Sequence, residues 1–501
     1  MGLLIGDVIR HASRVAPDGL AATLGDDELT FAEVDARANQ VARTLAALGV
    51  EHQDRVVWWS ETTLDAMPVF AALAKLGAIF MPVNARLGER EAAEVVAYAK
   101  PRLLVVDDAH APLAEGWTVS TVTHPALFSA ADGSDRSDVV TPHLDERDTH
   151  VIFFTSGSTG RSKGVVLSHR TSFLRSFPNL LTDHTGGTVC MFPLFHMAGW
   201  SMTLNAWQQR CPVHLVATPD AHSLLSTAQR RRATRLYHIP AVWNRVLEHD
   251  RSGYDLSAVR ECDTGTSATP PELLAAIKDA FPGTVTRVYY GSTEAGPATL
   301  LGDDDLDRKP GSVGRAAVTV DVRLDTDGEV CVHSEFLMDG YFEQPDATAA
   351  ALTPLEPGGP LWYRTGDLGV LDDDGFLSIV GRARDVLRTG GETVAPGEVE
   401  AVLGDHPDVA EVAVVGLPDP EWGEIVCAVV VLTDAATLAG AGPPSLEDLR
   451  EHCTGLLAPF KHPRRVVAME TLPRTAATGQ IQRTLLVERL SVPSEAQETS
   501  P

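Results

Sequence analysis

The sequence predicts an α/β protein, with a large N-terminal domain of packed sheets that carry helices on both faces and a small α+β C-terminal domain. The chain has 501 residues, which is too long for one simple core, so we expect more than one domain. Short apolar runs alternate with helix-period segments between residues 29 and 107, and this alternation is typical of parallel sheets covered on both faces. The pattern changes near residue 382, where a hairpin-like segment opens a new unit.

The elements of the large domain follow from their apolar periods. One helix is predicted because its apolar residues recur at intervals of four and three: Val34, Ala38, Val41, Leu45 and Leu48. Four apolar runs have the length of buried strands, at residues 55–60, 78–83, 102–108 and 150–154. The polar, turn-rich stretch 129–148 predicts a surface connection before the last of these strands.

The C-terminal part has its own set of elements. We predict a hairpin, two strands and a helix, in that order, at residues 372–385, 409–420, 425–432 and 445–457. The final residues are polar and lack an apolar pattern, which is typical of a disordered tail. We therefore expect a large domain over 1–382, a small domain over 383–490 and a tail over 491–501.

Composition excludes several classes of function. The formal net charge is −27, so the chain is not expected to bind nucleic acid, because phosphate backbones attract basic proteins. No apolar run approaches the roughly 20 residues of a membrane helix, so no membrane insertion is expected. The six cysteines stand far apart, which is typical of reduced cytoplasmic thiols and not of a disulfide framework or a zinc site.

The first motif with chemical content is the loop TSGSTGRSKG at residues 155–164. It combines Thr155, Ser156 and Lys163 with glycines, so that N–H groups, hydroxyls and one ammonium can surround a phosphate. It lacks the Gly-Lys-Ser/Thr ending of a Walker A loop. The alternative interpretation is a surface loop without a ligand.

Two further motifs contain candidate binding residues. VYYGSTEAG, at 288–296, offers Tyr290 to stack on adenine, Thr293 to bind a phosphate and Glu294 to hold Mg²⁺. Its alternative interpretation is a capped helix start. YRTGDLG, at 363–369, places Asp367 in a predicted turn, where the carboxylate can accept from ribose hydroxyls or serve only as a turn residue.

These motifs, in this order, resemble the adenylate-forming superfamily of acyl-CoA synthetases, peptide-synthetase adenylation domains and luciferases. The resemblance runs from LTFAEVDARANQVARTLAALGV to LPRTAATGQIQR and includes GTSATPPEL and GRARDVLRTGGETVAPGEVE. It implies a large N-terminal domain, a small mobile C-terminal domain and two half-reactions: a carboxylate and ATP give acyl-AMP, and a thiol then displaces AMP. Between the half-reactions the small domain would rotate about a hinge, and the matching position here is Arg384.

The resemblance also implies roles for the matching residues. Gly265 and Tyr290 would flank adenine, and Asp367 and Arg382 would bind the ribose. The residues expected near the phosphates are Thr155, Lys163 and Thr293, with Ser156 and Gly291 also near the nucleotide and Glu294 as a Mg²⁺ ligand only if ATP is used. For thiol transfer, Gly390 and Gly391 would let the pantetheine arm of coenzyme A pass, and His196 would meet Glu392. The alternative for His196 is a packed core histidine.

One position departs from the family pattern. The family loop ends in Pro-Arg/Lys-Thr-x-x-Gly-Lys, and its lysine bridges the substrate carboxylate and the α-phosphate during adenylation. Here three residues, one more than usual, separate Thr475 from Gly479. The lysine position is Gln480 when the loop is aligned on the glycine and Gly479 when it is counted from Thr475, and neither residue offers a cation. Lys461 is expected to have a structural role, while Arg474 and Arg483 would need a different geometry, because a guanidinium is a planar fork and not a compact charge.

The departure leads to a first hypothesis, with Gln480 counted among the catalytic positions. The enzyme would transfer an acyl group from acyl-AMP to coenzyme A, giving acyl-CoA and AMP, while making acyl-AMP poorly. A separate adenylating enzyme could then supply the adenylate. Two alternatives remain open: a complete ligase that uses acid, ATP and coenzyme A, and a catalytically idle protein that binds acyl nucleotides.

The acyl group is expected to be a small-molecule carboxylic acid. Trp200 and Trp243 are expected to line its pocket. Three small residues nearby, Ala198, Gly199 and Ala268, are expected to leave room for a bulky, cyclic or aromatic acid. Free coenzyme A is the expected thiol.

Overall fold

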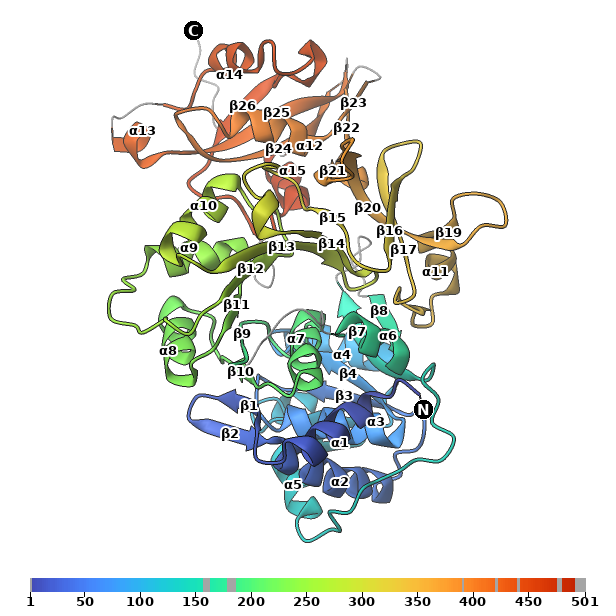
Figure 1. The fold of residues 1–501 in the computed structure, drawn as a ribbon. Coiled ribbons are helices and arrows are strands. Elements are labelled where there is room, and N and C mark those ends of the chain that lie inside the picture. The colour runs from blue at the N-terminus through green and yellow to red at the C-terminus, as the bar shows by residue number, and fades with distance from the viewer. Residues whose placement is uncertain are drawn as a thin grey trace. The chain divides into compact units, whose positions relative to one another are not determined.

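The computed structural model describes residues 2–155, 163–177, 186–389, 392–419, 422–438, 442–474 and 480–491 (Figure 1). The chain forms two compact units: unit 1 contains Met1–Val322 and Val332–Tyr363, and unit 2 contains Arg323–Cys331 and Arg364–Pro501. Unit 1 thus ends before the predicted limit at residue 382, because residues 364–382 make most of their contacts within unit 2. The position of the hinge stays a prediction, and the predicted tail from residue 492 lies outside the described residues.

The first sheet of unit 1 contains the four buried strands that the apolar runs predict. Its strand order is β18-β8-β7-β4-β3-β5-β6. The strands are β3 (Arg55–Trp59), β4 (Ile79–Val83), β5 (Leu103–Val106), β6 (Thr121–Thr123), β7 (Thr149–Thr155), β8 (Lys163–Ser168) and β18 (Gly340–Tyr341). The pairs among β3 to β7 are parallel, but β8 runs antiparallel to β7 and to β18. Strand β8 lies outside the range for which parallel pairing was predicted, and residues 156–162 are fewer than the dozen or so that a parallel crossover needs.

The second sheet of unit 1 has nine strands in the order β15-β14-β13-β12-β11-β9-β10-β1-β2. They are β1 (Leu20–Leu24), β2 (Asp27–Thr30), β9 (Thr188–Cys190), β10 (Val213–Leu215), β11 (Arg235–Tyr237), β12 (Glu261–Gly265), β13 (Val285–Ser292), β14 (Gly296–Leu301) and β15 (Arg315–Ala316). The central strands pair in parallel, and antiparallel strands close both edges. The parallel strands β12 and β13 carry several predicted site residues at their ends.

The predicted helix of the large domain is α2 (Phe31–Ala47). Thr30 and Glu33 form a capping box at its start. Its predicted apolar residues are buried except Leu48, which is the C-cap and is exposed because the helix ends before it.

The other helices of unit 1 cover the sheets (Figure 1). They are α1 (Ile5–Val15), α3 (Ala66–Leu76), α4 (Glu89–Ala99), α5 (His124–Ala131), α6 (His169–Arg175), α7 (Met197–Gln208), α8 (Ala221–Arg231), α9 (Pro240–Glu248), α10 (Pro271–Ala280) and α11 (Pro345–Ala351). Helices α6 and α7 lie between the two sheets, since α6 contacts β7 and β8 while α7 contacts β9 and β10. The start of α7 therefore lies where residues of both sheets come together.

Strands β16 (Val320–Leu324), β17 (Glu329–Ser334) and β20 (Leu361–Leu371) contain residues of both units. Within unit 1, β19 (Leu352–Pro354) pairs with the start of β20. Within unit 2, the rest of β20 pairs antiparallel with β21 (Leu377–Arg382), which confirms the hairpin predicted at 372–385.

The C-terminal part of unit 2 is a small α+β domain, as the sequence predicts. Its sheet has the order β23-β22-β25-β24, with β26 beside β25. The elements are β22 (Leu387–Thr389), β23 (Glu392–Val394), α12 (Pro396–Leu403), β24 (Val409–Asp419), β25 (Gly423–Leu432), α13 (Asp434–Leu438), α14 (Leu446–Cys453), β26 (Arg465–Ala468) and α15 (Arg483–Ser491). One face of the sheet packs on α12 and α14 and the other face packs on α15. Helix α14 is shorter than predicted, because the chain turns at Gly455 with a φ of +82°.

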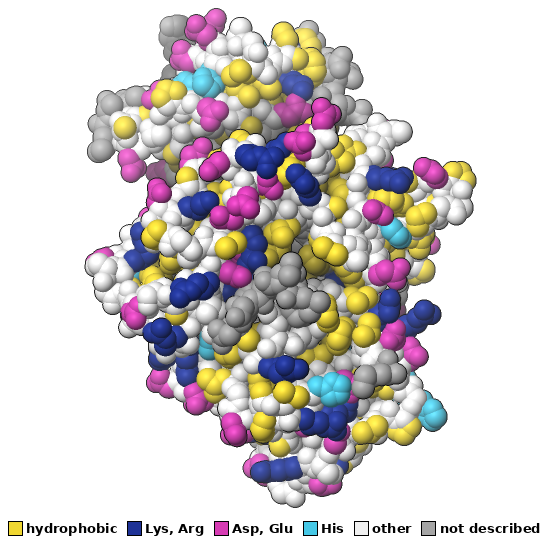
Figure 2. Space-filling view, viewed as in Figure 1, with side chains coloured by type: hydrophobic (Ala, Val, Ile, Leu, Met, Phe, Trp, Pro, Cys, Tyr) yellow, Lys and Arg dark blue, Asp and Glu magenta, His cyan; other side chains and the backbone are white. Residues whose placement is uncertain are grey.

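Three global features bear on the expected functions. All six cysteines are described, free and buried, and burial raises the pKa of the Cys190 and Cys262 thiols to about 12. Among the described residues, no helix combines the length and apolar character needed to cross a membrane. On the face shown in Figure 2, basic and acidic side chains are intermixed. Some oppositely charged side chains of the protein form ion pairs, such as Arg231 and Glu28, whose charged atoms lie 2.7 Å apart.

Candidate active site

The glycine-rich loop is held by the β7–β8 hairpin. Thr155 and Lys163 are directly opposite each other in the ladder, and the Thr155 hydroxyl donates to the Lys163 carbonyl at 3.5 Å. The loop thus joins two antiparallel strands and does not lead into a helix as a Walker A loop does. Ser156 lies outside the described residues. The hairpin fixes the direction in which Lys163 leaves the sheet.

The motif VYYGSTEAG forms a tight connection between β13 and β14. The alternative interpretation as a helix start was wrong: residues 293–295 form a turn, and the Ser292 hydroxyl accepts from the Ala295 N–H at 3.0 Å. A bulge separates Tyr290 from Gly291 in the ladder. Gly291 has no room for a side chain, since a Cβ there would lie 2.2 Å from the Gly296 carbonyl oxygen. The turn presents Thr293 and Glu294 beyond the strand ends.

Tyr341 connects this turn with the β7–β8 hairpin, a role that was not predicted from the sequence. Its hydroxyl donates to Glu294 Oε1 at 3.0 Å, and the Lys163 ammonium lies 4.6 Å from the centre of its ring. Burial and the nearby Glu294 raise the pKa of the Tyr341 hydroxyl, so it remains a proton donor at neutral pH. Unit 1 therefore brings the predicted phosphate and metal residues Lys163 and Glu294 together around one aromatic ring.

His196 is the N-cap of α7. Its Nδ1 accepts from the Ala198 N–H at 3.2 Å, and its ring stacks on Phe192 with centroids 5.7 Å apart. Burial lowers the pKa of His196 to about 4, so the imidazole is neutral at pH 7. Since Nδ1 accepts a bond, the proton of the neutral ring is on Nε2, which can donate. The orientation of the His196 ring is thus more constrained than that of a core histidine without hydrogen-bond partners.

An aromatic series leads from His196 to the predicted adenine-flanking glycine. Phe192 packs edge-on against Tyr237, with centroids 5.6 Å apart. Gly265 ends β12, and a Cβ at this position would lie 2.9 Å from the Tyr237 hydroxyl and 2.4 Å from the Tyr289 carbonyl oxygen. Only glycine fits between these neighbours, so Gly265 and His196 belong to one continuous group of residues in unit 1.

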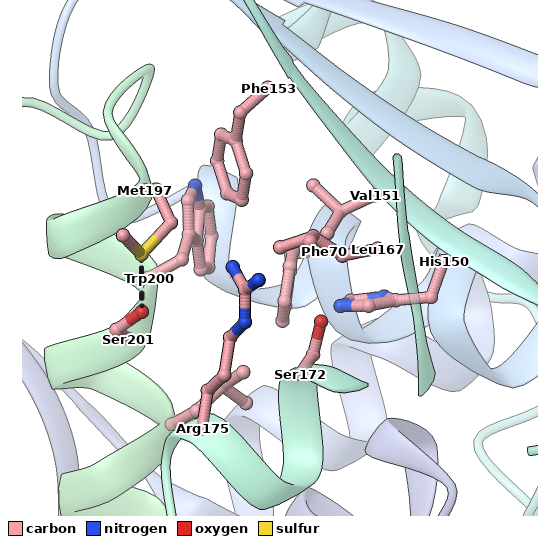
Figure 3. Close-up of a pocket in the computed structure, with 11 residues that line it drawn as sticks. Phe70, His150, Val151, Phe153, Leu167, Ser172, Arg175, Met197, Trp200 and Ser201 are labelled. Carbon is pink, nitrogen blue, oxygen red and sulfur yellow. Dashed lines mark hydrogen bonds between the residues drawn. The ribbon is translucent and has the colours of Figure 1, made fainter. Parts of the chain in front are cut away.

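Trp200 lies in the wall of a narrow cavity (Figure 3). Its ring stacks on Phe70 with centroids 3.9 Å apart, and its indole N–H donates to the Leu194 carbonyl at 2.6 Å. The cavity has a volume of about 10 Å³, which is room for one water molecule and not for an acyl group. The role of Trp200 in an acyl pocket stays a prediction.

Trp243 and Gly199 have the contacts of core residues. The Trp243 side chain is fully buried, packs against Phe281 and donates to the Asp263 carbonyl at 2.9 Å. A Cβ on Gly199 would lie 3.0 Å from the Pro193 carbonyl oxygen, so this glycine allows close packing of α7 and does not leave open room. The acyl-pocket role of Trp243 stays a prediction.

The predicted ribose residues meet in unit 2. Asp367 is directly opposite Arg382 in the β20–β21 ladder, and Arg382 Nε lies 2.6 Å from Asp367 Oδ1. Asp367 lies within strand β20 and not in a turn as expected; the positive φ of +72° at Gly366 produces the local bend instead. The pairing orients the Asp367 carboxylate, which is what a ribose-binding residue requires.

The remaining predicted residues of unit 2 are described in part. Arg384 lies in the one-turn helix Ala383–Asp385 and Glu392 begins β23, but their side chains lie outside the description. Gly390 and Gly391 lie outside the described residues. Gln480 is exposed and lies directly before Ile481, which forms an isolated antiparallel bridge with Arg474.

Glu294 is the residue that was expected to hold Mg²⁺. Among the described residues, no group of three His, Cys, Asp or Glu side chains is placed to hold a metal ion. Mg²⁺ commonly uses only one or two carboxylates together with substrate phosphates and water. Glu294, with one oxygen bound by Tyr341, fits that limited role.

Family comparisons agree with this arrangement. The model of the AMP-binding enzyme family matches residues 9–342, and that of the AMP-binding enzyme C-terminal domain matches residues 398–478. A long-chain-fatty-acid–CoA ligase, FadD13, of Mycobacterium tuberculosis is 32% identical over 97% of this chain and 98% of its own. A feruloyl-CoA synthase of Amycolatopsis sp. is 31% identical over 95% and 97%.

Solved structures show the same likeness. The ATP-bound RpMatB-BxBclM chimera B1 has a TM-score of 0.86 at 27% identity, covering 98% of this chain and all of its own. The o-succinylbenzoate CoA synthetase MenE from Bacillus subtilis, in complex with its acyl-adenylate OSB-AMP, has a TM-score of 0.82 at 25% identity, covering 96% and 97%. With its two family domains and its likeness along nearly the whole chain, this protein belongs to the AMP-binding enzyme family and is an acyl-CoA ligase.

Proposed function

We propose that this acyl-CoA ligase performs mainly the second half-reaction, transferring an acyl group from acyl-AMP to coenzyme A. The coenzyme A sulfur forms a bond to the acyl carbonyl carbon, the bond from that carbon to the phosphate oxygen breaks, and AMP leaves while the thiol proton passes to solvent. The observation that carries the proposal is Gln480, which stands where the family loop has its adenylation lysine.

The neighbouring cations support the proposal because each already has a carboxylate partner. Lys461 pairs with Glu398, which agrees with the structural role expected for it. Arg474 Nη2 lies 2.6 Å from Glu411. Arg483 forms two hydrogen bonds with Glu400, at 2.7 and 2.8 Å. A cation recruited from this set would first have to leave its carboxylate, at a cost that is small for the exposed Arg474–Glu411 pair and larger for the less exposed Arg483–Glu400 pair.

The missing charge affects the two half-reactions differently. Adenylation brings a carboxylate against a triphosphate, and a preorganised donor at such developing charge contributes about 3 kcal/mol, or 10² to 10³ in rate. Gln480 can donate a hydrogen bond but cannot offset the repulsion between two anions. Thioester formation starts from an anhydride already made, so it does not require this cation.

The nucleotide residues are retained in the proposal. Lys163 and Thr293 would contact the phosphates, and Asp367 and Arg382 the ribose. If ATP is used, Glu294 would hold Mg²⁺, which would neutralise phosphate charge. His196 is neutral and can donate a hydrogen bond through Nε2, and it would meet Glu392 during thiol transfer.

The test compares two assays on one purified sample. ATP–pyrophosphate exchange is measured with a panel of acids, including a long-chain fatty acid, ferulic acid, indoleacetate and 2-succinylbenzoate. Coenzyme A thioester formation is measured from the corresponding acyl-adenylates without ATP. Rapid thioester formation with silent exchange supports the proposal and directs a search for a separate adenylating enzyme.

A complete ATP-dependent ligase is the second candidate, and the residues around Tyr341 favour it, since Lys163 and Glu294 would serve adenylation. Relatives named long-chain-fatty-acid–CoA ligase and feruloyl-CoA synthase point the same way. Robust exchange in the first assay would establish this candidate and reject the half-reaction proposal. Failure of both assays across the panel would favour an idle acyl-nucleotide-binding protein.

A further inference from the structure

Arg175, the last residue of α6, is a buried arginine that binds three backbone carbonyls. Its Nε donates to Phe336 at 2.8 Å, its Nη1 to Thr293 at 2.6 Å and its Nη2 to Glu294 at 2.7 Å. Two of these carbonyls belong to consecutive residues of the turn between β13 and β14. A guanidinium presents its donors in a rigid plane, so it fixes the two peptide units relative to each other.

The turn is built closely around this guanidinium. Gly296, which ends the turn, has a φ of +72°, and a Cβ at Gly296 would lie 3.0 Å from Arg175 Nε. The other side of Arg175 faces the narrow cavity of Figure 3, beside Trp200 and Ser172. A smaller side chain at position 175 would therefore enlarge this cavity and would cause no steric overlap.

Arg175 stays charged although it is buried. Burial lowers the pKa of its guanidinium to about 10, and Asp339 and Glu294 act against that shift. No ion pair of Arg175 within 4.0 Å is found among the described residues, so its donors serve the carbonyls. Burying a charge in this way is costly unless its hydrogen bonds are satisfied, and the satisfied bonds here are those to the turn.

We propose that Arg175 is a positioning residue that sets the turn at 293–296 and thereby aims Thr293 and Glu294 at the phosphates and Mg²⁺ of the bound nucleotide. The inference rests on the nucleotide-binding role of these two residues in the proposed function. Arg175 fixes the backbone of the turn, while Tyr341 holds the Glu294 side chain. Arg175 and Tyr341 together restrict the position of the Glu294 carboxylate, one through its backbone and the other through its side chain.

The test uses Arg175→Met, which keeps the apolar stem and removes the donors, and Arg175→Lys, which keeps the charge but replaces the planar fork with a compact ammonium that does not match the positions of the three carbonyls. The matched control is Arg231→Met, because Arg231 also donates to a carbonyl, that of Gly25 at 3.0 Å, but its partners Gly25, Asp26 and Glu28 belong to the β1–β2 hairpin and not to the turn. Binding of Mg·ATP and of AMP is measured by calorimetry, with a Mg²⁺ titration at fixed ATP. Melting temperatures are recorded for every variant.

We expect Arg175→Met to weaken Mg·ATP binding by roughly 10- to 100-fold, as for the loss of a group that orients a metal ligand, and to raise the Mg²⁺ concentration for half-saturation. AMP binding should weaken less, since it needs no Mg²⁺. Arg175→Lys should recover part of the loss, and Arg231→Met should bind as the wild type does.

Three outcomes separate the inference from its foundation. Wild-type Mg·ATP affinity and Mg²⁺ dependence in a folded Arg175→Met protein would overturn the positioning role. Loss of folding in both Arg175 variants would also overturn it, because the residue would then serve the fold alone. If the wild-type enzyme binds neither Mg·ATP nor AMP, the nucleotide-binding role itself fails, whatever the variants do.

Discussion

Replacing Gly291 with alanine tests whether the β13–β14 turn must stay closed for nucleotide binding. A Cβ at Gly291 would lie 2.2 Å from the Gly296 oxygen and 3.1 Å from Pro297 Cα. Carbon and its neighbours normally keep about 3.5 to 4.0 Å, so the two strands must separate by roughly 1 Å or more. Such overpacking costs typically about 1 to 3 kcal/mol. We expect a lower melting temperature and at least about a tenfold loss of AMP affinity, measured by calorimetry.

The matched control is Gly302→Ala, at the other end of β14. A Cβ at Gly302 meets no atom within 4 Å, and its φ of −81° suits alanine, so stability should change by less than about 0.5 kcal/mol. Equal AMP affinity in the Gly291→Ala and Gly302→Ala proteins would refute the reasoning, since it would mean that the spacing of the strands does not control the turn.

Three further predictions follow from the same contacts. Gln480→Lys should raise ATP–pyrophosphate exchange by about 10² to 10³ while thioester formation from acyl-AMP stays within about twofold; an unchanged exchange rate would speak against the missing-cation hypothesis. Trp200→Ala should lower the free energy of unfolding of unit 1 by about 3 to 5 kcal/mol in urea titrations, because it removes the stack on Phe70; a loss below 1 kcal/mol would contradict this packing. Burial lowers the pKa of four histidines to about 4, so the unfolded chain, with pKa values near 6.5, binds more protons below that pH: His169, His196, His214 and His238. The urea midpoint should therefore fall as the pH drops from 6.5 to 4, and a midpoint constant over this window would show that these histidines titrate normally.

The buried strands were predictable because a run of apolar residues indicates a buried strand by itself, without knowledge of the strand that it pairs with. Strands β3, β4 and β5 lie within the predicted ranges, and β7 extends one residue beyond its predicted range at each end. The antiparallel edge was not predicted, because an apolar strand pattern carries no direction. Only the length of the connection from 156 to 162 indicates a hairpin.

The turn after Ser292 shows why local motifs are ambiguous. A serine side chain that accepts from the N–H three residues later begins a helix or closes a turn with the same hydrogen bond. Here it closes a turn. The continuation of β14 from Gly296 decides between the two, and no residue within the motif reveals it.

Residues that act across long sequence distances were missed. Arg175 contacts a turn more than a hundred residues away, and Tyr341 reaches Glu294 from another sheet. Neither lies in a motif with a chemical pattern of its own. By contrast, Lys163, Glu294, Asp367 and Arg382 could be named as candidates because their motifs are local; the structure adds how each is held, and their roles stay predictions.

The burial of all six thiols has a practical consequence for work on this enzyme. Reagents that detect free thiols, such as aromatic disulfides and maleimides, should report only added coenzyme A while the protein is native, so consumption of coenzyme A can be followed without a background from the enzyme. The same burial protects the cysteines from acylation by the reactive adenylate. When labelling does occur, it marks an opening event, and Cys190 and Cys427 would report separately on the two units.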